Sequence, residues 1–245
     1  MSNRQKIIAA NAKRYSQIET VDSYLGEEYH KIRINRAIDM FNRRLLGSLN
    51  TPTEEICVLE LASSTGTIAA RICEECKCKV IASDCESAPL YYANERGIQT
   101  ACFDASGDFP FSDNSFHGIF AGDIIEHIFD TSSFLFECSR VLKPNGVLLL
   151  TTPNLATLKD RILFLIGKTP SQIDPMHEYY FLHIRPFTYD CLKRCLVSTN
   201  FENIELTSNL VTLGGGKRNL LRSRLLARLI PTIGRSLIIC CNRTL

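Results

Sequence analysis

The sequence predicts an α/β protein with a doubly wound, mostly parallel β-sheet, and two observations lead to this fold class. Short apolar runs alternate with helix-length segments between residues 56 and 152, which is typical of a parallel sheet covered by helices on both faces. The first three runs end in or next to acidic residues, Glu60, Asp84 and Asp104. Because parallel strands end at one edge of a sheet, we expect these carboxylates to line a common crevice.

The composition bounds the class of protein. Of the 245 residues, 45% are hydrophobic and 22% are charged, which excludes disordered and fibrous classes. The chain opens without an apolar segment of signal-peptide type, and no apolar run approaches the roughly 18 residues of a membrane-spanning helix. We therefore expect a cytoplasmic protein. Its formal charge of +2 is uneven, because seven cations and no acidic residue follow Glu205.

Eleven cysteines are expected to be reduced thiols that pack as small hydrophobic residues. The segment CEECKC places Cys73, Cys76 and Cys78 at a spacing seen in metal sites. Cys73 falls on a predicted helix, Cys78 begins a predicted strand, and no second C-x-x-C pair follows. We therefore expect no metal there.

The chain begins with helical periodicity. Apolar residues recur at helical spacing up to Gly47, which predicts an N-terminal helical lid over residues 1–50 and a main domain over residues 51–245. Five strands are then predicted, at 56–61, 79–83, 98–103, 117–121 and 147–152, with a KPNG turn before the fifth.

After the fifth strand we expect an insertion on the substrate side, from about 154 to 186. It starts with a helix that stops at Gly167 and continues as an irregular span rich in aromatic residues. Thr188 is expected to cap the next helix. Two final strands, FENIEL and RSLIICC, bring the sheet to seven, and a basic helix is expected at about 217–230.

The stretch VLELASSTGTIAARI, residues 58–72, joins the first strand to a helix. It lacks the glycines of a G-x-G-x-x-G dinucleotide loop, which excludes that reading. An acidic-x-G-x-G-x-G frame fits better, with Ala62 and Ser64 in place of the first two glycines and Gly66 as the third. We expect negative φ at Ala62 and Ser64, and positive φ at Gly66.

Two further carboxylates suit a nucleoside. Asp84 follows Gly66 by 18 residues at the end of the second strand, where a carboxylate accepts hydrogen bonds from both ribose hydroxyls. Asp104 and Ala105, after the third strand, are placed to meet an adenine amine and ring nitrogen. A lone aspartate at a strand end often only caps a turn, so the prediction rests on finding acidic residues at three successive strand ends.

Four segments together resemble the class I S-adenosylmethionine-dependent methyltransferases of the type 11/23-like group. They are VLELASSTG, VIASDCE, CFDASGDFPFSDNSFHGIFAGDIIEHIFD and RVLKPNGVLLLTTPN, and they span about residues 56–154. HIRPFTYDCL at 183–192 extends the resemblance. It implies a Rossmann-like methyltransferase fold and S-adenosyl-L-methionine as cofactor. The implied cofactor-binding residues are Glu60, Ala62, Ser63, Ser64, Gly66, Asp84, Cys85, Asp104, Ala105, Gly122 and Asp123.

Methyl transfer is an in-line displacement that depends on orientation, and a weak nucleophile also needs its proton removed. The predicted catalytic residues are His183, His127 and Asp123, with His183 favoured as general base. Glu126 and His177 lie on the same predicted side. The structural alternative is that Glu126 and His127 face solvent and that His183 is a packed loop residue.

DIIEH followed by a downstream histidine also resembles the E-x-x-E-H arrangement of ubiquinone-pathway and small-RNA O-methyltransferases, in which a divalent metal meets the acceptor hydroxyls. A hard ion can lower the pKa of a bound hydroxyl. Its ligands here would be Asp123, Glu126, His127 and His183. A metal-free general base is the expected form.

We predict a methyltransferase for a small-molecule or glycan acceptor, with oxygen favoured as the acceptor atom. The candidate pocket aromatics are Phe164, Tyr179, Tyr180, Phe181 and Phe187. A non-catalytic S-adenosylmethionine-binding partner is the alternative from another class. The basic segment at 217–230 allows contact with a membrane surface or a lipid-linked substrate, whereas nucleic acid is not expected without a basic stripe interleaved with aromatics.

Overall fold

The computed structural model describes residues 26–48, 52–174, 176, 183–215 and 218–244. Its centre is a seven-stranded sheet in which β9 runs opposite to the other six strands. In spatial order the strands are β3 (Gln99–Cys102), β2 (Lys79–Asp84), β1 (Cys57–Leu61), β4 (Phe116–Gly122), β5 (Leu142–Pro153), β9 (Ser236–Arg243) and β6 (Phe201–Thr207). The predicted doubly wound, mostly parallel sheet is confirmed, including the two final strands.

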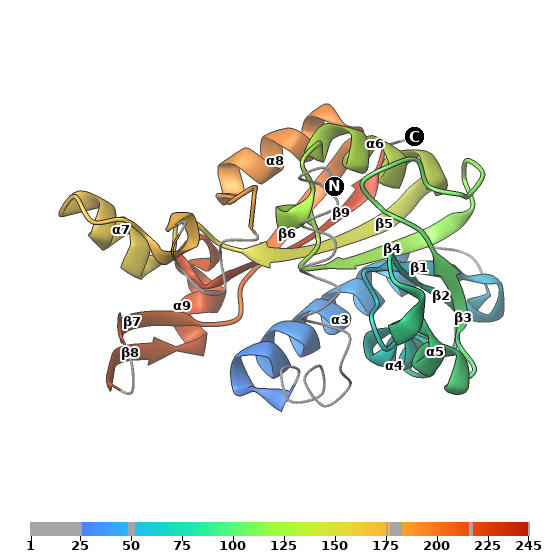
Figure 1. The fold of residues 1–245 in the computed structure, drawn as a ribbon, viewed down its shortest axis with the longest axis horizontal. Helices are drawn as coiled ribbons and strands as arrows, with labels where there is room; N and C mark the ends of the chain where they lie inside the picture. The colour runs from blue at the N-terminus through green and yellow to red at the C-terminus, as the bar shows by residue number, and fades with distance from the viewer. Residues whose placement is uncertain (1–25, 49–51, 175, 177–182, 216–217, 245) are drawn as a thin grey trace.

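Helices cover both faces of this sheet (Figure 1). One face carries α3 (Glu28–Ser48), α4 (Thr67–Cys76) and α5 (Ser87–Glu95), and the other carries α6 (Thr131–Val141) and α8 (Tyr189–Ser198). Each face has its own apolar cluster, which explains why β4 and β5 read as nearly continuous apolar runs. No helix in the described ranges is both long and apolar enough to cross a membrane.

Helix α3 is a layer of the core. Its Ala37, Ile38 and Phe41 side chains have no exposed surface. A Cβ atom at Gly118 of β4 would lie 2.7 Å from the Phe41 ring, so the absence of a side chain there lets the helix lie directly on the sheet. The described part of the predicted N-terminal lid is therefore packed on the sheet.

Local signals placed several helix ends correctly. Thr188 Oγ1 accepts a hydrogen bond from the Cys191 N–H at 3.3 Å and caps α8. In the insertion, Thr157 caps α7 (Leu158–Leu165) in the same way, and Gly167 beyond it has φ of +69°. A side-chain oxygen at the N-cap and a left-handed glycine after the last turn are the usual helix boundaries.

The prediction of a basic helix over 217–230 is wrong in its first half. Residues Arg218–Ser223 form strand β8, which pairs antiparallel with β7 (Val211–Gly215). Ser223 Oγ then accepts the Leu226 N–H at 3.1 Å and starts the shorter helix α9 (Arg224–Leu229). The strand forms because β7 satisfies its backbone hydrogen bonds, a contact that helical periodicity does not reveal. Three 3-10 turns, η1 (Thr53–Glu55), η3 (Ser171–Ile173) and η4 (Pro231–Ile233), connect neighbouring elements.

The insertion returns to the sheet where it left it. Asn154 forms an isolated parallel bridge with Phe187, and the Leu155 N–H donates to the Phe187 carbonyl at 2.8 Å. The Asn154 side chain is fully buried and donates to the carbonyls of Thr232 and Gly234 at 3.0 and 2.7 Å. The base of the insertion is thus fixed by hydrogen bonds.

All eleven cysteines are free thiols. Cys73 and Cys76 lie on α4, whereas Cys78 lies just before β2. Cys76 and Cys78 are buried in the apolar cluster on the sheet face that α3, α4 and α5 cover.

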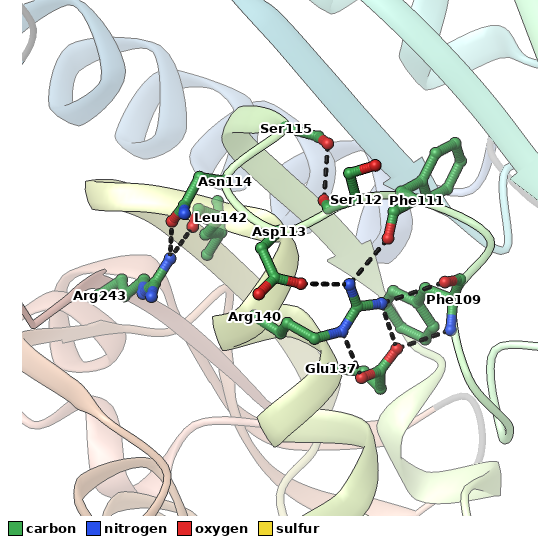
Figure 2. Close-up of polar contacts among 10 residues, drawn as sticks. All are labelled: Phe109, Phe111, Ser112, Asp113, Asn114, Ser115, Glu137, Arg140, Leu142 and Arg243. Atoms are coloured by element: carbon green, nitrogen blue, oxygen red, sulfur yellow. Dashed lines mark hydrogen bonds and ion pairs between the residues drawn. The ribbon is translucent and has the colours of Figure 1, made fainter.

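Arg140 of α6 holds the loop between β3 and β4 (Figure 2). Its guanidinium donates to the carbonyls of Phe109 and Phe111 at 3.1 and 2.8 Å and to the Asp113 carboxylate at 2.8 Å. It also pairs with Glu137, whose other contact is the Phe109 N–H at 2.7 Å. Because this loop follows the predicted adenine residues, the Arg140 contacts fix the chain next to the candidate site.

We expect Arg140→Ala to lower the free energy of unfolding by about 2 kcal/mol, since it leaves two carbonyls and two carboxylates without a charged donor. For a chain of this size the melting temperature should fall by about 4 to 8 °C. Thermal unfolding by circular dichroism measures both. Arg194→Ala, which removes an exposed pair with Asp190, is the control and should change stability by about 0.5 kcal/mol or less. Equal effects of the two substitutions would contradict the role of Arg140 in holding the loop between β3 and β4.

Candidate functional site

The loop between β1 and α4 reverses the chain in five residues at the carboxyl edge of the sheet. Its backbone is left-handed at three of them, with φ of +54° at Ala62, +50° at Ser64 and +72° at Gly66. The prediction for Gly66 is confirmed, and the expectation of negative φ at Ala62 and Ser64 is wrong. Ala62 and Ser64 therefore adopt the left-handed backbone conformation that glycine favours, at a cost of about 1–2 kcal/mol per residue.

Gly66 has a second reason to lack a side chain. A Cβ atom there would lie 2.5 Å from the Cβ atom of Ala93 on α5. Rotation of a side chain cannot relieve this clash, because the Ala93 Cβ atom is fixed to the helix backbone. Ala62 is exposed by contrast, and Ser64 is half-buried. Both the positive φ and the packing against Ala93 therefore require glycine at Gly66.

Glu60 lies beneath this loop. It is 2% exposed and accepts a hydrogen bond from the Ser63 hydroxyl. Burial raises its pKa to about 8 against that hydrogen bond. Ser63 is itself fixed by its N–H, which donates to the Ser83 carbonyl of β2 at 2.8 Å. Glu60 thus supports the loop from the core side.

Asp84 faces the loop from the end of β2. Its Oδ2 accepts the Ser64 N–H at 2.9 Å and its Oδ1 accepts the Glu86 N–H at 3.2 Å. Burial raises the pKa of this carboxyl against those two hydrogen bonds. The loop and the second predicted carboxylate are thereby brought together, and Cys85, the next residue, is exposed beside them.

The donor set at this edge fits a ligand with hydroxyl and amine groups. The Ser64 hydroxyl oxygen is buried without a hydrogen-bond partner in the described structure, and a buried polar atom normally has one. The half-buried Asp84 carboxylate lies next to it. These groups suit the nucleoside and amino-acid portions of S-adenosylmethionine.

Asp104 and Ala105 follow β3 at the same edge. Asp104 Oδ1 accepts the N–H and the hydroxyl of Ser106 at 2.9 and 2.6 Å, which closes a turn. Ala105 packs against the apolar cluster of the α6 face together with Phe103. Their place beside β2 agrees with the predicted adenine end, and their contact with a base stays a prediction.

Asp123 follows Gly122 at the end of β4 and turns toward helix α3. Its carboxylate forms an ion pair with Arg33 and accepts the Thr151 hydroxyl at 2.8 Å. Its φ of +50° is a further left-handed value for a residue with a side chain. Asp123 was predicted as a catalytic or metal-binding residue, and the structure shows that its carboxylate is already paired with the Arg33 guanidinium.

Arg33 is a site residue that the sequence did not predict. It is 6% exposed, although a charged residue on a helix normally faces water. Tyr29 fixes this end of α3, because its hydroxyl lies 2.5 Å from Ser236 Oγ and its ring lies under the Arg235 guanidinium. Nothing local to the helix reveals the pairing with Asp123.

His30, one turn before Arg33, is also buried. Burial and the nearby guanidiniums of Arg33 and Arg235 lower its pKa to about 3. It is therefore a neutral imidazole near physiological pH, and sequence reasoning missed it for the same reason.

The structure brings Glu126, His127 and His183 together. Their ligand atoms all lie within 4.8 Å of one another, and the two imidazole rings meet edge to face with centroids 5.0 Å apart. Glu126 is 2% exposed and accepts the Thr152 hydroxyl at 3.0 Å. Burial raises its pKa to about 7. Such a cluster can hold a proton or a divalent ion.

The chain near His183 is held against the turn η2 (Ile125–His127) by Arg185. The Arg185 N–H donates to the Glu126 carbonyl at 3.0 Å, and its side chain donates to the Phe129 carbonyl at 3.0 Å. Three of the four predicted metal ligands therefore converge, while Asp123 is paired with Arg33. Of the other candidates, His177, Tyr179, Tyr180 and Phe181 lie outside the described residues, Phe164 is 51% exposed, and Phe187 is buried.

Comparison with known sequences finds S-adenosylmethionine-dependent methyltransferases. A family model described as a methyltransferase domain matches residues 59–150. A probable S-adenosylmethionine-dependent methyltransferase of Mycobacterium tuberculosis is 27% identical over 129 residues, 52% of this chain and 42% of that protein. The ubiquinone/menaquinone biosynthesis C-methyltransferase UbiE of Francisella philomiragia is 28% identical over 179 residues, 64% of this chain and 72% of that protein. The chain thus spans less than half of the mycobacterial relative.

Solved structures share the fold. The CurJ carbon methyltransferase superposes with a TM-score of 0.64 at 16% identity, over 94% of this chain and 59% of that chain. Phosphoethanolamine N-methyltransferase 2 of Haemonchus contortus, in complex with phosphomonomethylethanolamine and S-adenosylhomocysteine, gives a TM-score of 0.60 at 19% identity, over 84% and 46%. At these identities the likeness concerns the fold, and the predicted Rossmann-like methyltransferase fold is confirmed.

The buried Glu60 predicts a pH dependence of stability. Its pKa rises from 4.5 to about 8 on folding, so the folded protein keeps a proton that the unfolded chain releases above pH 4.5. The stability contributed by protonated Glu60 is complete below that pH and is lost as the pH rises through about 8. Glu60→Gln, which stays neutral, should therefore gain stability relative to the natural protein across this window.

Urea unfolding at several pH values within the window measures the difference. Glu202→Gln replaces an exposed carboxylate on β6 and serves as the control, with a curve parallel to that of the natural protein. A Glu60→Gln difference that is the same at both ends of the window contradicts the raised pKa.

Proposed function

Because the chain belongs to the class I S-adenosylmethionine-dependent methyltransferases, we propose that it is an enzyme that methylates a hydroxyl oxygen of a small-molecule or sugar acceptor. The observation that carries the choice of oxygen is the convergence of Glu126, His127 and His183 at the edge that also carries the cofactor loop. A hydroxyl is a weak nucleophile and needs such a proton acceptor. We propose the cytoplasm as its compartment, in keeping with eleven free thiols.

The cofactor would be held by the edge of β1, β2 and β3. S-adenosylmethionine supplies an electrophilic methyl group when bound. Asp84 would accept the two ribose hydroxyls, Asp104 and Ala105 would meet the adenine, and the Ser64 hydroxyl would gain the partner it lacks. The left-handed backbone at Ala62 and Ser64 keeps the loop shape that glycines give, which supports binding of the cofactor.

The chain's own residues then orient and deprotonate the acceptor. His183 would take the hydroxyl proton, with His127 beside it as the second imidazole. Glu126, held by Thr152, would stabilise the positive charge that forms on the imidazole pair. The Arg33–Asp123 pair would set the end of β4 between cofactor and acceptor. Positioning of this kind supplies most of the rate in a direct displacement.

Two variants of this function have specific support. The cluster of Glu126, His127 and His183 could hold a divalent ion that lowers the acceptor's pKa. Methylation at carbon is the other variant, because UbiE and CurJ are named as carbon methyltransferases. A deprotonated hydroxyl on an unsaturated acceptor can pass its electron pair to a neighbouring carbon, so the same base serves both outcomes.

Asp84→Ala should weaken S-adenosylhomocysteine binding by about ten- to a hundredfold, because a hydrogen bond to a charged acceptor contributes about 1.5–3 kcal/mol. Calorimetric titration measures the affinity. Asp84→Asn, which keeps one acceptor oxygen for the Ser64 N–H, should lose less. The exposed Asp108→Ala is the matched control. Unchanged affinity in a folded Asp84→Ala protein would remove Asp84 from the ribose site.

His183→Ala should lower kcat by about a hundred- to ten-thousandfold, the usual contribution of a general base, with cofactor affinity unchanged. The assay uses labelled S-adenosylmethionine with a panel of hydroxylated metabolites and sugars, and mass spectrometry distinguishes methyl ether from carbon-methylated product. Loss of activity on chelation, restored by Mg²⁺ or Zn²⁺, would favour the metal-assisted form. Full activity of His183→Ala would refute the proposed base.

A further inference from the structure

One end of the molecule exposes an unusual share of its large apolar side chains. Among the described residues, sixteen large hydrophobic side chains are exposed, and ten of them belong to α7, η3, β8 or α9 or lie within three residues of one of these elements. We call these ten the apolar end surface. They are Ile162, Phe164, Leu165, Ile166, Ile173, Met176, Leu220, Leu225, Leu229 and Ile230.

The elements of this surface are neighbours in space. Helix α7 packs against β7, which pairs with β8, and α9 packs against β7 and η4. Figure 1 shows α7, β7, β8 and α9 together at the left end of the molecule, apart from the helices that cover the sheet. The apolar end surface therefore gathers residues from two distant stretches of the chain.

Exposure is high on both helices of the apolar end surface. Leu165 at the end of α7 is 85% exposed and Ile166 after it is 61% exposed, while Leu225 and Leu229 on α9 are 66% and 68% exposed. Leucines at i and i+4 share one helical face. Side chains of this size, exposed in a group, mark a contact with another apolar phase or surface.

The ionic groups among these residues are mainly cations. Among the side chains that the structure describes, the lysines and arginines on α7, β8 and α9 or beside them are Lys159, Arg161, Lys168, Arg222, Arg224 and Arg228. The carboxylates are fewer: Asp160 is buried against Thr157, Asp174 accepts the Met176 N–H, and Glu28 of α3 pairs with Arg222 and Arg224. The exposed apolar side chains are thus bordered by excess positive charge.

We propose that the apolar end surface docks the protein on an anionic lipid membrane surface. Apolar side chains enter the boundary between headgroups and acyl chains, and neighbouring lysines and arginines attract anionic headgroups. Lys168, two residues after Ile166, is placed to keep its ammonium group at the headgroups while its stem stays in apolar surroundings. This inference does not depend on the acceptor or on the acceptor atom.

Charge decides between a membrane and a second copy of the chain. Two copies joined through this surface would bring the same cations together, and like charges across an interface oppose association. A bilayer with anionic lipids offers the opposite sign over the whole surface. The cations therefore favour the lipid as occupant.

The test is sedimentation of the full chain with vesicles. Equal parts of phosphatidylglycerol and phosphatidylcholine should bind the protein, and phosphatidylcholine alone should bind it at least about fivefold more weakly for each cation engaged. Leu165→Ser/Leu229→Ser should lower the partition coefficient by about tenfold for each leucine. Lys168→Gln/Arg228→Gln should lower the partition coefficient on anionic vesicles and leave it unchanged on phosphatidylcholine vesicles.

Matched controls lie on the other helices. Phe136→Ser/Val197→Ser removes two exposed apolar side chains from α6 and α8, and Arg194→Gln removes an exposed cation from α8; all should bind as the natural protein does. Circular dichroism confirms folding of each variant, independently of activity. Absence of binding, or equal binding by the leucine variant, overturns the proposal. The proposal is also overturned if sedimentation velocity shows that the natural protein is a dimer and that the leucine variant is a monomer, because the surface then binds a second copy of the chain.

Discussion

The reversal of the chain between Leu61 and Thr67 is the constraint on which the rest of the candidate site depends. Parallel strands deliver their ends to one edge, and the chain must turn there within five residues to begin α4. Left-handed backbone at Ala62, Ser64 and Gly66 achieves this. The same turn presents the Ser64 N–H to Asp84 and places Gly66 against Ala93. Strain in the loop is thus the condition for bringing β1, β2 and α5 to one point.

Charge burial is the second organising feature. Glu60 and Glu126 are buried carboxyls with raised pKa values, each stabilised by one hydroxyl donor, Ser63 or Thr152. Asp123 differs because Arg33 supplies a full positive charge. Removing one partner of a buried pair leaves an uncompensated charge, which is strongly destabilising. Helix α3 is therefore bound to the site electrostatically as well as to the sheet by apolar packing.

The sequence predicted what is local. The strand runs, the Thr188 cap and the stop at Gly167 depend on residues within one turn or strand, and each was found in place. The convergence of Glu126, His127 and His183 followed from family-like order and from strand ends sharing an edge.

What the sequence could not predict depends on distant partners. The helical pattern around Arg33 predicts a surface charge, and only the folded structure brings Asp123 of the β4 end to it. The pattern of residues 218–223 predicts a helix, but pairing with β7 makes them a strand. The left-handed φ at Ala62 and Ser64 was missed because residue preference opposed it. There the tight connection between β1 and α4 overrides the preference of the side chains.

The insertion joins the candidate acceptor chemistry to the apolar end surface. It leaves the sheet at Asn154 and returns at Phe187, and these two residues form a bridge at its base. Helix α7 projects from that base (Figure 1), whereas His183 lies beside Glu126 on the irregular segment that returns to it. Buried Asn154 ties the base to the η4–β9 segment through two carbonyls. Helix α7 begins soon after Asn154, and His183 shortly precedes Phe187. The proposed membrane contact at the tip of α7 and the proposed acceptor site at His183 therefore both adjoin one short, buried framework at the base of the insertion.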